Sequence, residues 1–261
     1  MLKFIGKQWK KAWGAITSNP VWKSYWLHGL EDTPKNRNLT SFNNVFLHIH
    51  PSQIEWDKLK LDYTFGMGGI TFLLFILLIW SGVVLMFYYR PTAVHAYDDI
   101  KDLQYAVTLG FFMRNFHRWC AHGMVISVVL HMARVFYTGA YKAGREFNWV
   151  IGVILLVLTY LLSFSGYLLP WDQISIWAVT VGTNMARATP LLGAEGPFSV
   201  VTPMNDARFA LLGSYNVGEN ALLRFYVLHC VFFPVLLTLF LAPHLWRVRK
   251  NDFSGPRDRE E

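Results

Sequence analysis

Four segments of the chain are long and apolar enough to cross a lipid bilayer, and they constrain its fold more than any other feature. A membrane-spanning helix needs about 20 mostly apolar residues and must satisfy its own backbone polar groups. The composition fits this class, because 53% of the 261 residues are hydrophobic and only 16% are charged. We therefore predict an all-α membrane protein, a four-transmembrane-helix bundle with spans at residues 68–89, 115–137, 149–169 and 222–246.

The remaining residues surround this bundle. Residues 1–62 form an extension that starts with MLKFIGKQWKKAW, which is basic and amphipathic and lacks a long apolar core. This pattern predicts an N-terminal amphipathic surface helix rather than a signal peptide. Residues 63–250 form the four-helix domain, and residues 251–261 form a tail. The connection at 171–221 is too long for a simple link, so we expect it to hold surface helices and to carry function.

Lys and Arg are distributed unequally between the two sides of the predicted bundle. Four spans place both termini on one side, which carries 16 Lys and Arg against seven on the other. Positive residues favour the cytoplasmic side, so both termini are predicted to be cytoplasmic. The first and third spans then run outward, and the second and fourth run inward. The net charge of +7 is thereby explained by membrane topology, without a nucleic-acid partner.

Four histidines lie inside the spans in two matched pairs. His117 and His131 are 14 residues apart in the second span, and His229 and His244 are 15 apart in the fourth. Fourteen residues rise about 21 Å and return to within about 40° of the same helix face. Fifteen overshoot by about 60°, but two prolines in the fourth span can bend it. Because these spans run parallel, His117 is predicted to meet His229 near the outer face. His131 is predicted to meet His244 near the cytoplasmic face.

Glycines repeat this spacing in the other two spans. The first span contains Gly68 and Gly82, and the third contains Gly152 and Gly166, again 14 residues apart in each case. Glycine has no side chain, so a large flat group can approach the backbone there. With the orientation above, Gly82 and Gly166 lie at the outer level, and Gly68 and Gly152 lie at the inner level.

Paired histidines with glycines beside them are what a porphyrin requires, and we predict two haem b groups. One iron is bound by His117 and His229, the other by His131 and His244. Two imidazoles leave no open iron position, which suits electron transfer rather than oxygen binding. Zinc is a poor alternative, because it prefers three or four protein ligands. A single buried histidine is often only a hydrogen-bonded core residue, but four in matched pairs argue against that interpretation.

Three arginines lie next to the predicted haem ligands. Arg114 and Arg118 flank His117, and Arg134 lies one turn beyond His131. Charge-assisted pairing with the anionic haem propionates is expected. The alternative is that Arg118 and Arg134 extend to lipid headgroups.

Several strings in the sequence resemble the cytochrome b family. They cover about residues 63–256 and are HRWCA at 117–121, LHMARVFYTGAYK at 130–142, REFNWVIGV at 145–153, GYLLPWDQ at 166–173 and LLRFYVLH at 222–229. The chain looks most similar to the split type, cytochrome b6 and its menaquinol-oxidising bacterial relatives. Its four spans, the PWDQ string and the 15-residue histidine spacing favour this type over the long mitochondrial one.

This resemblance implies a subunit of a Rieske/cytochrome b quinol:cytochrome c oxidoreductase in a bacterial inner membrane. Quinol, with menaquinol favoured, would be oxidised near the outer haem. One electron would go to a Rieske iron–sulfur protein and on to a c-type cytochrome. The other would cross to the inner haem and reduce quinone, with proton translocation. By the same resemblance, the outer quinol pocket would be bordered by Phe164, Tyr167, Trp177, Ala178 and Val181.

The resemblance also implies partner subunits. The chain departs from the family pattern at one cofactor-binding position. The PEWY glutamate of the family is not in this chain and is expected on a separate three-helix subunit, like subunit IV, so no catalytic residue is assigned here. The complex is expected to be a homodimer. In cytochrome b6 a cysteine holds an extra haem c, and the matching position here is Gly66. A covalent third haem is therefore not expected.

Two other classes remain as alternatives. A four-helix dihaem anchor for a hydrogenase or formate dehydrogenase would share the histidine ligation, but not PWDQ or the glycine quartet. A membrane scaffold or transporter without redox function would need the histidine pairs to arise by chance.

Overall fold

The computed structural model describes residues 2–18, 33–43, 64–142 and 144–251, and every regular element in these ranges is a helix. The chain forms two compact units, Met1–Glu55 and Trp56–Glu261. The first unit contains α1 (Leu2–Ser18), where the N-terminal amphipathic helix was predicted, and α3 (Pro34–Asn43). Residues 44–63 of the predicted extension and domain start, and residues 252–261 of the predicted tail, lie outside the described ranges.

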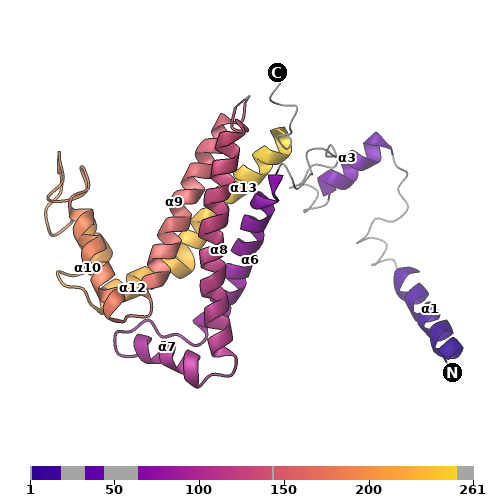
Figure 1. Cartoon of the computed structure of the whole chain (residues 1–261), viewed down its shortest axis with the longest axis horizontal. Coiled ribbons are helices and arrows are strands. Elements are labelled where there is room, and N and C mark those ends of the chain that lie inside the picture. Colours follow the sequence, from indigo (N-terminus) through magenta and orange to yellow (C-terminus); the bar gives the residue numbers. More distant parts are fainter. Residues whose placement is uncertain (1, 19–32, 44–63, 143, 252–261) are drawn as a thin grey trace. The chain divides into compact units, whose positions relative to one another are not determined.

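The second unit is built around four helices that are long and apolar enough to cross a membrane. They lie side by side in Figure 1. This confirms the predicted all-α membrane bundle. The fourth is assembled from three consecutive pieces, the second of which is a π-helical turn. The helices are α6 (Met67–Met86), α8 (Gly110–Tyr137), α9 (Glu146–Leu168) and the run of α12 (Glu219–Val227), η2 (Leu228–Phe232) and α13 (Phe233–Asn251).

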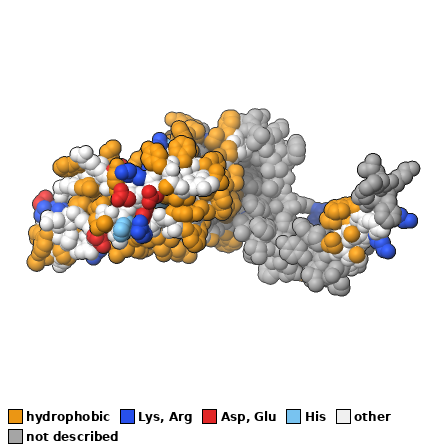
Figure 2. Space-filling model, turned by 90° about the horizontal axis from the view of Figure 1, so that it is seen from below, with side chains coloured by type: hydrophobic (Ala, Val, Ile, Leu, Met, Phe, Trp, Pro, Cys, Tyr) orange, Lys and Arg blue, Asp and Glu red, His pale blue; other side chains and the backbone are white. Residues whose placement is uncertain are grey.

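The bundle packs as two helix pairs. Helix α6 runs along α8, α9 runs along α13, and the pairs meet through α8 and α9. Phe75, Met124, Leu155 and Leu237, one from each helix, belong to a common core in the middle of the bundle. Much of the remaining apolar surface faces outward, and orange hydrophobic side chains surround a polar and charged patch in Figure 2. Helices that are apolar on all sides are expected where lipid surrounds them.

Shorter helices pack at the end of the bundle where α6 ends and α8 begins. They are α7 (Ala96–Tyr105), α10 (Gln173–Arg187) and α11 (Ala207–Leu212). With α12 and the end of α9 they bury a second core that includes Leu168, Trp171, Val179, Leu212 and Leu222. Helices α10 and α11 are in the 171–221 connection, where surface helices were predicted. Helix α7 was not predicted.

The helix ends differ from the sequence predictions in all four spans. The third begins at Glu146 rather than 149, and the fourth runs from Glu219 to Asn251 rather than from 222 to 246. The first span ends at Met86 rather than Tyr89, and Pro91 follows shortly after. The second begins at Gly110, five residues before the predicted start. Leu109 there has a left-handed backbone with φ of 60°, and a side chain at Gly110 would collide with the carbonyl oxygen of Leu103. The contact between α7 and α8 therefore fixes where α8 starts.

An ion pair joins the end of α6 to α7. The backbone N–H of Arg90 donates to Asp99 Oδ2 at 2.8 Å, and its guanidinium donates to both carboxylate oxygens. Asp99 is buried, with 4% of its surface exposed, whereas the Arg90 side chain is 60% exposed, so the pair lies at the edge of the solvent. Hydrogen bonds from Arg90 lower the pKa of Asp99. Figure 2 looks at this end of the bundle and shows acidic, basic and histidine side chains gathered there.

Candidate cofactor site between paired histidines

His117 and His229 face each other across the interior of the bundle. His117 comes from α8 and His229 from the π turn, so the two helix pairs each supply one ring. The ring centroids are 6.3 Å apart, and the ring planes lie at 75° to each other. An imidazole nitrogen binds a transition metal at about 2 Å, so one ion between two such nitrogens sets the ring centroids about 6 Å apart. The separation fits a single metal bound by both rings.

Each of these histidines lies against a glycine of the neighbouring helix. A Cβ atom at Gly82 would lie 3.3 Å from Cε1 of His117, and one at Gly166 would lie 2.6 Å from Cε1 of His229. The second distance is too short for a real contact, so only glycine fits at position 166 with the ring in this place. The nearest neighbours of the missing side chains are the histidine rings themselves.

Hydrogen bonds orient both rings. Nδ1 of His117 lies 2.9 Å from Ser81 Oγ. Nδ1 of His229 lies 3.2 Å from Ser165 Oγ and 3.0 Å from the carbonyl oxygen of Leu162. A carbonyl can only accept, so Nδ1 of His229 carries a proton and donates it. That tautomer leaves the lone pair of Nε2 for a metal, as in most histidine metal ligands.

His131 and His244 form the second pair, further along the same two helices. They lie close enough for an electrostatic interaction between the two rings. A Cβ at Gly68 would lie 3.4 Å from Cε1 of His131, and one at Gly152 would lie 3.7 Å from Cε1 of His244. Each of the four glycines therefore faces one of the four histidines, although the second pair has more space beside α9.

The π turn explains how a 15-residue spacing matches a 14-residue one. The turn Leu228–Phe232 contains His229 and makes wider backbone hydrogen bonds than an α-helix. It takes up one extra residue, so His244 returns to the face that His229 occupies. Pro234, two residues beyond the turn, has no N–H to donate to the carbonyl of Cys230, which favours the wide turn. Bending at the two prolines was the predicted adjustment, and the structure makes it with a π turn instead.

The three arginines beside the histidines have different surroundings. Arg114 donates from Nη1 to Gln104 Oε1 at 2.9 Å, which ties α8 to α7. Arg118 is exposed and Arg134 is half-buried. His122 lies outside both pairs, with Nδ1 2.7 Å from the carbonyl oxygen of Arg118 and its ring near Tyr167.

The residues expected to border a quinol pocket come from the end of α9 and from α10, which pack together. Phe164 is next to Gly182 of α10, because a Cβ there would lie 2.9 Å from its ring. Trp177 and Val181 are exposed and one turn apart on α10, and Tyr167 is exposed on α9. Ala178 packs against the second core. Together they give this corner a partly exposed apolar surface.

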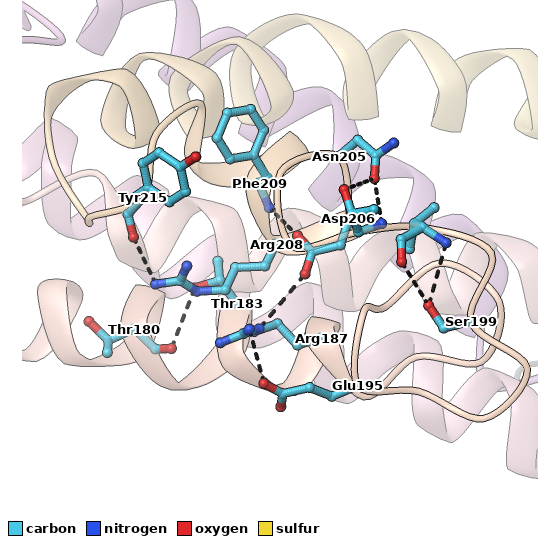
Figure 3. Close-up of polar contacts among 12 residues, drawn as sticks. Thr180, Thr183, Arg187, Glu195, Ser199, Asn205, Asp206, Arg208, Phe209 and Tyr215 are labelled. Carbon is cyan, nitrogen blue, oxygen red and sulfur yellow. Dashed lines mark hydrogen bonds and ion pairs between the residues drawn. The ribbon is translucent and has the colours of Figure 1, made fainter.

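Polar contacts fix the connection that follows α10 (Figure 3). Arg187 Nη2 lies 3.0 Å from Glu195 Oε1, and its Nε lies 3.8 Å from Asp206 Oδ2. Asp206 is only 1% exposed, and its Oδ1 accepts from the Phe209 N–H at 2.8 Å, which caps α11. These residues, like Ser81 and Ser165, were not among the predicted site residues. Each serine directly precedes one of the spaced glycines, but this position alone does not reveal a contact with a histidine of another helix.

The fold and its interior define a membrane protein with four spans and facing histidines between two helix pairs. The chain belongs to the cytochrome b family, because the family model described as cytochrome b/b6/petB matches residues 56–252. This is a family of haem b proteins of electron transport.

Relatives and a solved structure agree with this assignment. Cytochrome b6 of Euglena gracilis is 40% identical over 190 residues, covering 73% of this chain and 83% of the relative. Cytochrome b6 of Gracilaria tenuistipitata var. liui is 41% identical over the same shares. A chain of a "Hyperthermophilic respiratory Complex III" is similar with a TM-score of 0.67 and 26% identity. That match covers 87% of this chain and 55% of the other.

Proposed function

We propose that this chain is the dihaem cytochrome b subunit of a Rieske/cytochrome b quinol:cytochrome c oxidoreductase. The observation that carries the proposal is the pair His117 and His229, whose ring centroids are 6.3 Å apart with a glycine beside each ring. The similarity to cytochrome b6 proteins and to a chain of a respiratory Complex III supports the kind of complex.

In this proposal His117 and His229 bind one haem b, and His131 and His244 bind the other. When bound, the haems supply one-electron redox chemistry. The chain orients the imidazoles by hydrogen bonds and by the glycines that let the rings approach α6 and α9. Arg114, Arg118 and Arg134 would offset the charge of the haem propionates. Two histidines per level leave no site for oxygen.

The proposed quinol site is the corner made by the end of α9 and by α10. Phe164, Tyr167, Trp177, Ala178 and Val181 offer an apolar surface, with the Tyr167 hydroxyl as a polar group. Quinol, with menaquinol favoured, gives one electron to a Rieske protein and on to a c-type cytochrome. The other would pass from the His117–His229 level to the His131–His244 level, and two such electrons, from two turnovers, would reduce one quinone there. A three-helix PEWY subunit supplies the glutamate that accepts a proton.

The proposed setting is a bacterial inner membrane, with both termini cytoplasmic and the complex a homodimer. The excess of Lys and Arg on the side of the termini supports this orientation. Protons from quinol then leave on the outer side, and protons for quinone enter from the cytoplasm. A covalent haem c is not part of the proposal, because Gly66, the residue before α6, has no thiol.

Haem content of single-histidine variants tests this assignment. The purified complex should give two haem b per chain in a pyridine haemochrome measurement. The His131→Ala variant should keep one, because the His117–His229 pair is intact. His122→Ala is the matched control, since His122 is on the same helix but outside both pairs, and it should keep two.

Two results would contradict the proposal. A wild-type complex without a b-type band in its reduced-minus-oxidised spectrum would exclude haem binding altogether. A His131→Ala variant that keeps both haems would exclude the pairing.

A further inference from the structure

The two histidine levels differ in a buried hydroxyl. Ser81 directly precedes Gly82, and Ser165 directly precedes Gly166. Both serines are almost fully buried, with 0% and 1% of their surface exposed. Each places Oγ near Nδ1 of the histidine at its level, at 2.9 Å for His117 and 3.2 Å for His229. At the other level Met67 precedes Gly68 and Ile151 precedes Gly152, so neither position offers a hydroxyl.

Each serine donates its own hydroxyl proton to a backbone carbonyl and not to the histidine. Ser81 Oγ donates to the carbonyl oxygen of Leu77 at 2.7 Å. Ser165 Oγ donates to the carbonyl oxygen of Leu162 at 3.1 Å. A serine hydroxyl has only one proton, so each oxygen is left to accept from the imidazole N–H. The serines therefore accept from the ring at Nδ1 and do not compete for the Nε2 lone pair. At His229 this N–H is shared with the carbonyl oxygen of Leu162, at 3.0 Å.

This arrangement changes the electron density of the ligand. An imidazole that donates its second N–H is a more basic ligand at the other nitrogen. A more basic ligand stabilises the oxidised metal over the reduced one, and hydrogen bonding around the ligands is a main control of haem potentials. The effect is strengthened in the interior, where the local dielectric constant is low.

We propose that Ser81 and Ser165 are positioning residues that lower the reduction potential of the haem bound by His117 and His229 relative to the haem bound by His131 and His244. This rests on the proposed function. The reaction affected is the transfer of one electron from the first haem to the second. The first haem is oxidised, the second is reduced, and no bond is made or broken. A lower potential at the serine level favours electron flow from quinol oxidation toward quinone reduction.

The test is a potentiometric titration of both haems in the purified complex, followed by their visible spectra. Ser81→Ala and Ser165→Ala should each raise the potential of one haem and leave the other unchanged. One neutral hydrogen bond changes an equilibrium roughly two- to tenfold, so the equilibrium between the haems should shift by that factor per serine. Ser81→Thr, which keeps the hydroxyl, should restore the wild-type potential.

Two controls separate a tuning role from a structural one. Ser127 is a buried serine of α8 that donates to the Met124 carbonyl and contacts Thr71, so Ser127→Ala should change neither potential. Ile151→Ser places a hydroxyl before Gly152 and should lower the potential of the other haem.

The outcomes that overturn the proposal are equally definite. They are equal shifts of both haems, no shift with both haems retained, a lowered potential, or haem loss in both alanine variants. Haem quantification of the wild type is independent of these results. A wild type without two haems would contradict the proposed function instead.

Discussion

The His117–His229 and His131–His244 levels are built from the same parts, two histidines and two glycines, but they are packed differently. At the first level a Cβ at Gly166 would lie 2.6 Å from the histidine ring, whereas at the second a Cβ at Gly152 would lie 3.7 Å away. Among the described residues, serines lie against the rings and short helices cover the bundle end at the first level. A repeated spacing therefore fixes where ligands meet, while local packing decides how tightly each is held.

The largest expected effect is from Gly166→Ala. The added methyl group would occupy the space of the His229 ring, and the ring is also held by Leu162 and Ser165. We expect the variant to lose the haem of the first level and keep the other, so haemochrome content falls from two to one. Alanine favours a helix over glycine by about 1 kcal/mol, so a loss cannot come from helix propensity. Two retained haems with wild-type spectra would show that the ring is free to move.

The spans and the histidine pairs could be predicted because both depend on helix geometry. Apolar length identifies a span, and a spacing of 14 places His117 and His131 on one face without knowledge of any neighbour. The contact between a histidine level and its glycines follows from the same periodicity once the helix directions are known.

Other features depend on contacts between helices and were not accessible. A serine inside a helix usually bonds a carbonyl of its own preceding turn, so the sequence does not reveal that Ser81 and Ser165 also meet a histidine. The π turn is signalled only by Pro234, which is equally compatible with a kink. The start of α8 is set by the packing of Gly110 against α7, which the apolar pattern of α8 does not contain.

A smaller effect, confined to the same level, is expected from Asp99→Asn. The Arg90–Asp99 pair holds α7 against the segment that follows α6, the helix that carries Gly82. The variant should lose a minority of the first-level haem on heating and none of the second. Haem loss from each level can be followed through its absorption band during a thermal ramp.

The pH dependence of this effect has a definite sign. Arg90 lowers the pKa of Asp99 in the folded protein, so its stabilisation is present above the unfolded pKa of about 3.9. It is lost as the pH falls through the lower folded value. Wild type and Asp99→Asn should therefore differ by a constant amount from about pH 7 to about pH 5 and converge below about pH 4. A difference that grows on acidification would assign the stabilisation to another group.

The smallest effect is expected from Gly152→Ala, the counterpart of Gly166→Ala at the second level. A Cβ there would meet Met132 Sδ at 3.5 Å and His244 Cε1 at 3.7 Å, which are ordinary contacts. Met132 is flexible and can move away at little cost. We expect both haems to remain and the thermal stability to stay within about 1 kcal/mol of the wild type, since alanine favours the helix.

Gly152→Ala also decides between two origins of the glycine requirement. If the glycines serve to seat the histidine rings, the tolerance at 152 and the intolerance at 166 follow from the distances of 3.7 and 2.6 Å. If they serve instead to clear the face of a porphyrin, the 14-residue spacing makes all four equivalent. Gly152→Ala would then remove a haem as completely as Gly166→Ala does. Haem content of these two variants, measured side by side, separates a contact set by local packing from one set by the cofactor.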